Sequence, residues 1–261
     1  MAGMFNQASP VTGNVALIMP ALNEEAVVGE QVRAILAHPG LQALPVSQVI
    51  VVDNGSMDST AAVAQMAGAT VVRQPRRGYG FACLAGVLAA RNAEIIVLMD
   101  ADGSDDLAGV EHVVRSVMNG TADLAMGSRV RGHLEHGALT LQQRIGNTLA
   151  TLLLRWLFGT HVTDLGPMRA IRRSSLLALE MQEMTYGWST EMLVKAAKTG
   201  YRVVEVPVDY HRRAGGRSKV SGTISGTLRA SWCILSTILR YARWQPATLT
   251  GERPAFATIP E

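Results

Sequence analysis

The sequence contains few cysteines and few charged residues for its length. The two cysteines, Cys83 and Cys233, lie far apart with no paired spacing, which argues against a disulfide framework and against a zinc knuckle. Only 17% of the 261 residues are charged and the formal net charge is +3, so a polybasic surface for nucleic acid is not expected. The small positive excess instead suits an anionic partner, such as a phosphate-bearing substrate or a lipid surface.

Long apolar runs are also lacking. The two most apolar stretches, 149–158 and 232–239, are interrupted or bounded by arginines and fall short of the roughly 18 apolar residues that a membrane-spanning helix needs. Residues 1–13 lack the basic start and apolar run of a signal peptide and are expected to be flexible. Residues 245–261 are expected to be a mobile tail. These features favour a location of the protein in the reducing cytoplasm. Peripheral contact with the inner face of the cell membrane stays open.

Short β-branched apolar runs alternate with helical segments in the first half, which is typical of βαβ units and a parallel sheet. Strands are expected at 15–19, 48–52, 70–73, 94–99 and 122–126, and helices at 24–37, 59–66, 81–90 and 107–118. The second half is less regular, with helices expected at 140–158 and 190–198, strands at 168–171 and 202–208, a basic loop at 211–219 and a long helix ending near residue 244. With 48% hydrophobic residues, the chain can bury the core of a single α/β domain.

Three acidic loops follow the expected strands, at 20–25, 53–58 and 100–106. Because ligands bind at the carboxyl ends of strands in open parallel sheets, these loops should face one crevice. Asp100 and Asp102 end an apolar strand with one small residue between them, and two such close carboxylates repel unless a proton or a hard divalent cation neutralises them. Their position after a buried-looking strand favours a Mg²⁺ or Mn²⁺ site over a solvated acidic turn, and that metal would also bridge the oxygens of a nucleotide diphosphate.

The other loops allow two interpretations each. Asp53 either holds a donor group of a base or ribose or only starts a tight turn. Asn23 either contacts a ligand or caps the following helix, whose positive end suits Glu24 and Glu25. The segment 76–80 brings two arginines and two glycines to a helix start, as a phosphate-approaching loop would, or forms an ordinary basic turn.

Taken in order, these loops resemble the nucleotide-binding half of family 2 glycosyltransferases, with the patterns Pro-x-x-Asn-Glu, Asp-x-x-Ser and Asp-x-Asp. Four later segments, at 127–129, 164–169, 186–192 and 213–219, resemble the polyprenyl-phosphate branch typified by dolichyl-phosphate mannose synthase. The resemblance implies a GT-A fold, a Rossmann-like and mostly parallel central sheet flanked by helices, as a single domain at 14–244. It further implies a nucleotide-binding half at 14–130 and an acceptor half with amphipathic helices at 131–244.

Site residues are carried over from the resemblance by position. It implies a UDP or GDP sugar as donor, held by Pro20, Ala21, Asn23, Glu24, Asp53, Gly78, Asp100 and Ala101, with a metal on Asp100 and Asp102. Arg129, Arg213, Ser218 and Lys219 would bind phosphate or acceptor groups, and Asp164, Glu191, Arg129 and Arg213 would be catalytic. Leu22 and Ser104 depart from the Tyr and Gln that the dolichyl-phosphate enzymes tend to have, so the nucleotide stays open.

Met192 decides the expected acceptor. Many family 2 enzymes that glycosylate a hydroxyl have a general-base Asp at the matching position, and losing such a base costs about 10²–10⁴ in rate. A phosphate monoester is already anionic, so the sequence predicts an inverting displacement by a polyprenyl-phosphate-like acceptor, with Asp164 and Glu191 orienting the reactants. The helical stretches at 147–158 and 225–244 mix apolar residues with Arg, Trp and Tyr. They could lie in a membrane interface, close the core or form a homodimer contact.

Two other functions stay open: transfer to a soluble sugar or phosphorylated metabolite, and nucleotide-sugar binding without turnover. A nucleotidyltransferase is disfavoured because all three lysines, Lys195, Lys198 and Lys219, lie late in the chain. A Rossmann dehydrogenase is disfavoured because no Gly-x-Gly-x-x-Gly follows the first strand.

Overall fold

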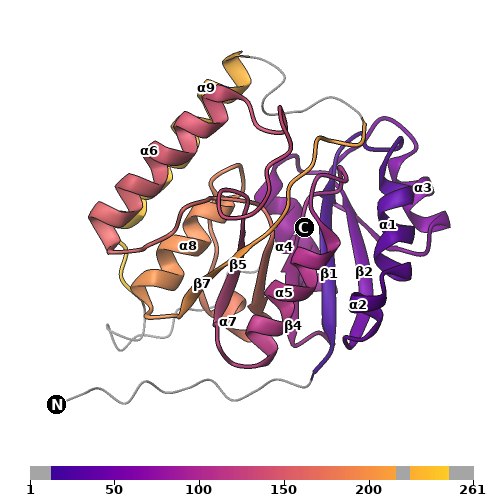
Figure 1. The fold of residues 1–261 in the computed structure, drawn as a ribbon. Helices are drawn as coiled ribbons and strands as arrows, with labels where there is room; N and C mark the ends of the chain where they lie inside the picture. Colours follow the sequence, from indigo (N-terminus) through magenta and orange to yellow (C-terminus); the bar gives the residue numbers. More distant parts are fainter. Residues whose placement is uncertain (1–12, 216–223, 247–261) are drawn as a thin grey trace.

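The computed structural model describes residues 13–215 and 224–246 (Figure 1). The flexible start expected at 1–13 and the tail expected at 245–261 lie almost wholly outside these residues, and so do Ser218 and Lys219. The expectations for those residues therefore stay predictions.

The described chain forms one seven-stranded sheet with the order β3-β2-β1-β4-β6-β5-β7. The strands are β1 (Val15–Ala21), β2 (Val46–Asp53), β3 (Thr70–Arg73), β4 (Ile95–Leu98), β5 (Leu124–Ser128), β6 (Arg169–Arg172) and β7 (Val203–Pro207). β6 runs antiparallel to its neighbours β4 and β5, whereas the other pairs are parallel. The mostly parallel α/β sheet expected from the sequence is confirmed.

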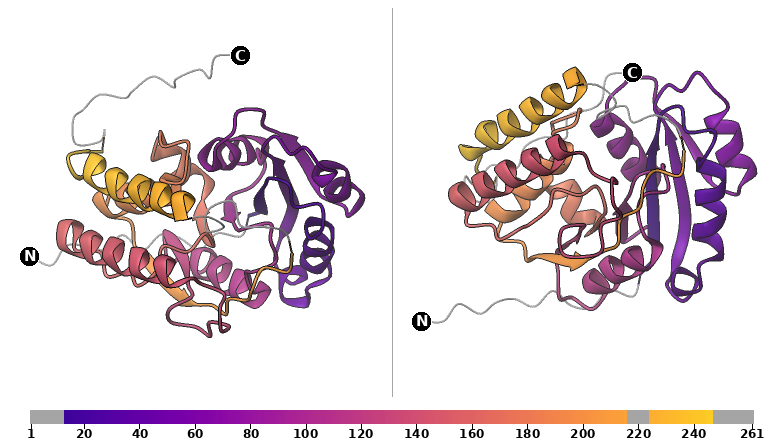
Figure 2. Two further views of the ribbon diagram at one scale, coloured as in Figure 1. Left: turned by 90° about the horizontal axis from the view of Figure 1, so that it is seen from above. Right: turned by 45° about the horizontal axis from the view of Figure 1, so that its top comes forward.

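Helices cover both faces of the sheet (Figure 2). They are α1 (Val28–Ala37), α2 (Pro39–Gln42), α3 (Thr60–Met66), α4 (Tyr79–Ala89), α5 (Leu107–Met118), α6 (Leu141–Phe158), α7 (Arg173–Ala178), α8 (Trp188–Lys198) and α9 (Ile224–Ala242). Successive residues of β1 enter different cores: Leu17 packs with α1, α3 and α5, and Ile18 packs with α4 and α8. Strands covered on both faces read as continuous apolar runs, which is why β1 was recognisable from its sequence.

Helices α6 and α9 lie side by side on one face of the molecule (Figures 1 and 2). Thr140 and Gln143 form a capping box at the start of α6, and Gly159 ends it in the left-handed conformation. The inner faces of the two helices bury residues such as Leu154 and Ile238 in the core. Their outer faces expose Leu149, Leu152, Trp156, Trp232 and Leu239. Both helices therefore close the core and also present apolar side chains to the outside. Among the described residues, no helix has the length and apolarity to cross a membrane.

Candidate active site

The loops after β1 and β2 are tied together by hydrogen bonds. Asn23 receives a bond from the amide of Met57 on its Oδ1 (2.8 Å) and donates its own amide to Ser56 Oγ (3.0 Å). Its φ of 52° lies in the left-handed region, which Asn tolerates better than most residues. Of the two interpretations of Asn23, the helix cap does not hold, because α1 starts only at Val28. Asn23 instead joins the two loops that would enclose a nucleoside.

The other residues expected to bind the nucleoside lie in or beside the same loops. Pro20 and Ala21 end β1, and the amide of Asn54 donates to the carbonyl of Ala21. Asp53 Oδ1 accepts the amide of Ser56 (2.9 Å), so this oxygen makes the tight turn that was the alternative interpretation. The amide of Glu24 donates to Thr60 Oγ1 (2.8 Å). The structure brings these residues to one edge of the sheet, and their contact with a nucleotide stays a prediction.

Gly78 and Gly80 have a packing role that the sequence did not reveal. A Cβ on Gly78 would lie 2.4 Å from the carbonyl oxygen of Met184, and one on Gly80 would lie 2.4 Å from the carbonyl oxygen of Glu183. Gly78 also has a φ of 151° and donates its amide to Asn54 Oδ1 (2.8 Å). The two glycines therefore allow the start of α4 to touch the backbone of 183–184.

Three carboxylates gather after β4. Burial, together with the charges of Asp102 and Asp105, raises the pKa of Asp100 well above its usual range. Burial and the charge of Asp102 likewise raise the pKa of Asp105 to about 7, although its Oδ2 accepts the amide of Asp100 (3.0 Å). Ala101 between them is buried. Asp105 was not expected in this cluster, and its place within the acidic loop 100–106 was the available signal. A cation beside this cluster would stabilise its ionised carboxylates.

In the structure, the side chain of Arg213 places a positive charge beside these carboxylates. Its guanidinium lies 2.9 Å from Asp102 Oδ2 and 2.6 Å from Glu24 Oε1, and the amide of Ala214 donates to the carbonyl of Asp102 (3.1 Å). From the sequence, Asp102 was expected to hold a metal and Arg213 to bind a phosphate. In this conformation the two side chains are paired with each other instead, because the segment after β7 crosses the acidic loop.

The donor set nevertheless fits a divalent cation. Mg²⁺ and Mn²⁺ prefer carboxylate oxygens, and Mg²⁺ in particular is usually held by one or two protein carboxylates together with phosphate oxygens of a substrate. Asp100 and Asp102 supply such a pair. The described residues contain no cluster of three or more His, Cys, Asp or Glu side chains arranged for a metal, so a cation here would need ligand oxygens and the release of Asp102 from Arg213.

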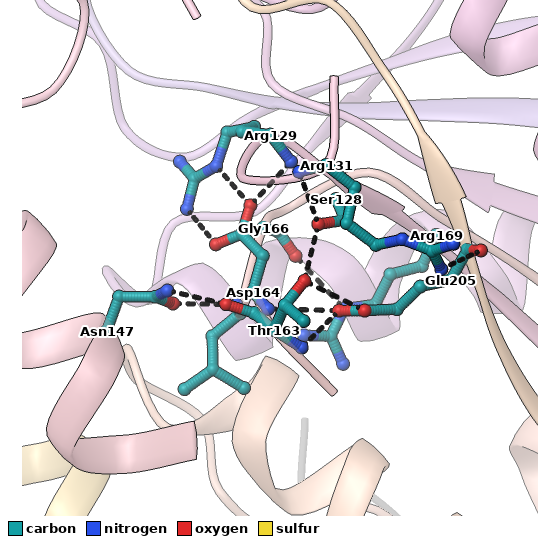
Figure 3. A network of polar contacts seen from close by, with 10 residues as sticks. Ser128, Arg129, Arg131, Asn147, Thr163, Asp164, Gly166, Arg169 and Glu205 are labelled. Carbon is teal, nitrogen blue, oxygen red and sulfur yellow. Dashed lines mark hydrogen bonds and ion pairs between the residues drawn. The ribbon is translucent and has the colours of Figure 1, made fainter. Parts of the chain in front are cut away.

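Arg129 forms the second charged centre, together with Asp164 (Figure 3). Its backbone amide, Nε and Nη2 all donate to the carboxylate of Asp164, at 2.7 to 2.9 Å, and its guanidinium lies 4.9 Å from the ring centre of Tyr210. Burial lowers the pKa of Arg129, but the bonds and charge of Asp164 outweigh this effect and raise it above its usual range. The guanidinium uses Nε and Nη2, and not Nη1, in its bonds to Asp164. Asp164 is fully buried, so it orients Arg129 and has no exposed surface for a sugar.

Glu191 lies apart from both centres. Its carboxylate accepts the amides of Gln182 and Glu183 and pairs with Lys195 (2.8 Å), and both charged side chains are fully buried. The expectation that Glu191 orients a reactant by contact does not match this geometry. The residue instead fixes the segment 182–184, which packs against Gly78 and Gly80.

Replacing Glu191 with Gln is expected to destabilise the protein by about 3 kcal/mol, because Lys195 would keep a buried charge without its partner. Chemical denaturation of the purified variant measures this loss. The double variant Glu191→Gln, Lys195→Met should recover part of the stability, because it removes both charges. A single variant as stable as the wild type would show that the pair is not needed for the fold.

Arg169 is a buried cation that was not among the expected site residues. Its Nε and Nη1 donate to the carbonyls of Gly166 and Ser189, and its Nη2 has no partner among the described residues. Burial lowers its pKa to about 10. Its position within the resembling segment 164–169 was the signal that could have found it. Arg169 joins the Asp164 loop to the start of α8.

Comparison with known sequences decides the family. The sequence model of glycosyl transferase family 2 matches residues 16–179.

The chain belongs to glycosyl transferase family 2.

Three relatives support this membership in the family. An uncharacterized glycosyltransferase of Mycobacterium tuberculosis is 41% identical over 226 residues, which cover 85% of this chain and 98% of the relative. A dolichyl-phosphate hexose transferase of Haloferax volcanii is 34% identical over 207 residues, covering 77% and 85%. An undecaprenyl-phosphate mannosyltransferase of Micrococcus luteus is 34% identical over 197 residues, covering 70% and 80%. The chain is thus a glycosyltransferase that uses a nucleotide sugar, and it is similar to members of the polyprenyl-phosphate branch.

Solved structures confirm the GT-A fold of this family 2 enzyme. Glucosyl-3-phosphoglycerate synthase from Mycobacterium tuberculosis, in complex with Mn²⁺, UDP-glucose and phosphoglyceric acid, superposes with a TM-score of 0.72 at 23% identity. The match covers 88% of this chain and 80% of that one. Because the sequence identity is this low, the similarity is evidence for the fold alone.

Proposed function

We propose that this glycosyltransferase moves a sugar from a UDP or GDP sugar to a polyprenyl-phosphate-like acceptor, with inversion at the anomeric carbon and with a divalent metal. The observation that carries the proposal is the pair of opposite charged centres at one edge of the sheet, where the charge of Arg129 acts on the pKa of Asp100 and Asp105. The carboxylates after β4 suit a cation, and the guanidinium of Arg129, held by Asp164 through Nε and Nη2, suits an anion. Two relatives named for dolichyl-phosphate and undecaprenyl-phosphate transfer support the choice of acceptor.

Donor binding follows from the loops. Pro20, Ala21, Asn23, Glu24, Asp53 and Gly78 would surround the nucleoside, with Asp100 and Ala101 at the ribose. Asp100 and Asp102 would hold Mg²⁺ or Mn²⁺, which when bound neutralises the charge that develops on the departing nucleotide diphosphate. Solved complexes of glucosyl-3-phosphoglycerate synthase hold Mn²⁺ or Mg²⁺ with UDP, which is consistent with this donor chemistry.

The transfer itself needs no protein base. An acceptor phosphate oxygen forms the new bond to the anomeric carbon while the bond from that carbon to the donor phosphate oxygen breaks, and the nucleotide diphosphate leaves with the electron pair. Arg129, held by Asp164, would position the attacking phosphate. Met192 is fully buried in the core, so it offers no group to deprotonate a hydroxyl acceptor. Ser218 and Lys219, which lie outside the described residues, would complete the phosphate contacts.

The outer faces of α6 and α9 support a lipid acceptor. Trp156 is 81% exposed and Trp232 is 74% exposed, and aromatic side chains of this kind favour a membrane interface. No Asp or Glu occurs in α6, which carries Arg144 and Arg155. We therefore include peripheral contact with an anionic membrane surface in the proposal.

A transfer assay tests the proposal. Purified protein is incubated with UDP and GDP sugars, with Mn²⁺ or Mg²⁺, and with undecaprenyl phosphate or unphosphorylated undecaprenol. Sugar transfer to the phosphate but not to the alcohol is the expected result. Equal transfer to the alcohol would contradict the role of Arg129, and transfer only to a soluble phosphate such as phosphoglyceric acid would favour the second candidate. In that case the same guanidinium would bind a small phosphorylated acceptor.

Replacing Arg213 with Gln should raise the affinity for Mn²⁺ alone by roughly fivefold, because Asp102 no longer has to be released from an ion pair. Turnover should fall, since Arg213 is also proposed to bind phosphate. Isothermal titration measures the affinity. The neighbouring Arg212→Gln is the control, because Arg212 bonds to Glu135 and His136 and not to Asp102. Unchanged Mn²⁺ affinity in the Arg213 variant would show that the pair does not compete with a cation.

A further inference from the structure

Helix α6 reaches the Asp164 loop through the side chain of Asn147. The amide nitrogen Nδ2 donates to the carbonyl of Thr163, and Oδ1 accepts the backbone amide of Leu165, both at 2.9 Å. These two backbone groups flank Asp164 on either side (Figure 3). One side chain therefore fixes the backbone at Asp164 in the way that a neighbouring strand would.

The loop is held from β7 as well. Glu205 Oε1 accepts the amides of Thr163 (2.7 Å) and Asp164 (2.9 Å), and its Oε2 bonds with Thr163 Oγ1 (2.9 Å). The carboxylate of Asp164 in turn receives three N–H groups of Arg129. The fully buried Asp164 is thus bonded to Arg129 through its carboxylate, while the backbone around it is held by Asn147 and Glu205.

The position of α6 depends on contacts outside the loop. Its inner face packs Ala150 and Leu154 into the core, while Leu149, Leu152 and Trp156 are exposed on its outer face. The helix that carries Asn147 is therefore fixed to the core on its inner face, and its outer face is open to a binding partner.

We propose that Asn147 is a positioning residue that transmits the placement of α6 to the guanidinium of Arg129. Its effect on an acceptor phosphate rests on the proposed function, whereas its effect on Arg129 does not. Substitution by Ala removes both bonds to the loop. Thr163 and Leu165 are partly accessible and can bond to water instead, so the fold should persist. Small errors in placing a reactant cost up to about 100-fold in rate, and we expect a loss of about tenfold here.

Asn147→Ala is compared with Thr148→Ala, whose hydroxyl donates only to the carbonyl of Arg144 within α6. The protein is produced with ¹⁵N-labelled arginine. The Nε–H resonance of Arg129 is then identified as the one that is missing from the spectrum of Arg129→Lys. Its exchange with water should be at least about tenfold faster in Asn147→Ala than in Thr148→Ala, because the bond to Asp164 is no longer held in place. Equal exchange in the two variants would overturn the proposal.

Kinetics give the second readout. For Asn147→Ala, kcat/KM for the acceptor phosphate should fall about tenfold while KM for the nucleotide sugar changes less than about twofold, since the loops after β1, β2 and β4 do not contact Asn147. If Asn147 were only structural, Asn147→Ala would lower the melting temperature without a selective loss in kcat/KM for the acceptor phosphate. That result would overturn the proposal. If the wild type transferred no sugar to any phosphate, the proposed function would fail, and the resonance of Arg129 would still decide the role of Asn147.

Discussion

Replacing Asp102 with Asn is expected to lower sugar transfer about 10³-fold and to abolish the stabilisation by Mn²⁺ and nucleotide diphosphate. Loss of a preorganised charge at the point where transition-state charge develops costs about 10²–10³ or more in rate. Asp102 is proposed to hold that charge together with Asp100. Steady-state kinetics and thermal shift with and without Mn²⁺ measure the two effects, because a ligand that binds only the native state raises its apparent stability.

Asp106→Asn is the matched control for this experiment. Asp106 lies in the same acidic loop, but its Oδ2 caps α5 by accepting the amide of Gly109 (3.0 Å). Asn is an equally good capping residue, so the control removes one charge from the loop and leaves the helix start intact. Wild-type turnover and a wild-type Mn²⁺ shift in Asp102→Asn would remove this residue from the metal site.

Replacing Arg129 with Lys is expected to lower kcat/KM for the acceptor by about 10²–10³. Lys keeps the positive charge but cannot pair with Asp164 through two parallel bonds while offering a further nitrogen to a phosphate. Nucleotide and metal binding should change little, because Lys keeps the positive charge that acts on Asp100 and Asp105. Acceptor titrations at saturating donor measure the loss, and nucleotide thermal shifts confirm that the donor site is intact.

Arg131→Lys serves as its control. Arg131 is two residues away and bonds to the carbonyl of Glu205 through its exposed side chain (3.1 Å). The Lys variant of Arg129 is preferred over Ala, because removing the cation would leave the buried Asp164 uncompensated and cost about 3–5 kcal/mol in stability. An Arg129→Lys enzyme that matches Arg131→Lys in acceptor kinetics would contradict the phosphate role.

The two charged centres differ in how the protein prepares them. Arg129 is fixed by Asp164 through three bonds, so it is oriented in the ligand-free protein. Asp102 is paired with Arg213, so a cation must first displace this arginine. On the proposed function, the acceptor side is thus preorganised, while the donor side must open.

Local sequence patterns predicted much of the fold. The apolar run of β4 and its two acidic residues placed a carboxylate pair at a strand end, because burial on both faces of a central strand leaves a continuous apolar signature. Thr140 and Gly159 marked the limits of α6 to within a residue or two, since capping depends on neighbours in the chain. The short helices α2 and α7 were missed because four and six residues show too little periodicity to recognise.

The partners of two other residues depended on contacts between distant segments. Asn23 has the residue type of a helix cap, yet it bonds to the loop that contains Ser56 and Met57. Glu191 has the residue type of a catalytic acid, yet it pairs with Lys195 inside the core. In both cases the residue type allowed several partners, and the packing of distant segments selected one.

By itself, the sequence determined the α/β class, the order of most helices and strands, and the presence of acidic strand ends, because each depends on residues close together in the chain. Only the tertiary structure decided which charges are neighbours. Arg213 and Glu24 are 189 positions apart, and Asn147 touches Thr163 and Leu165 only because α6 folds back along the loop. Side-chain interactions act over a few ångströms, so the path of the backbone has to bring such groups together before any preference between them can act.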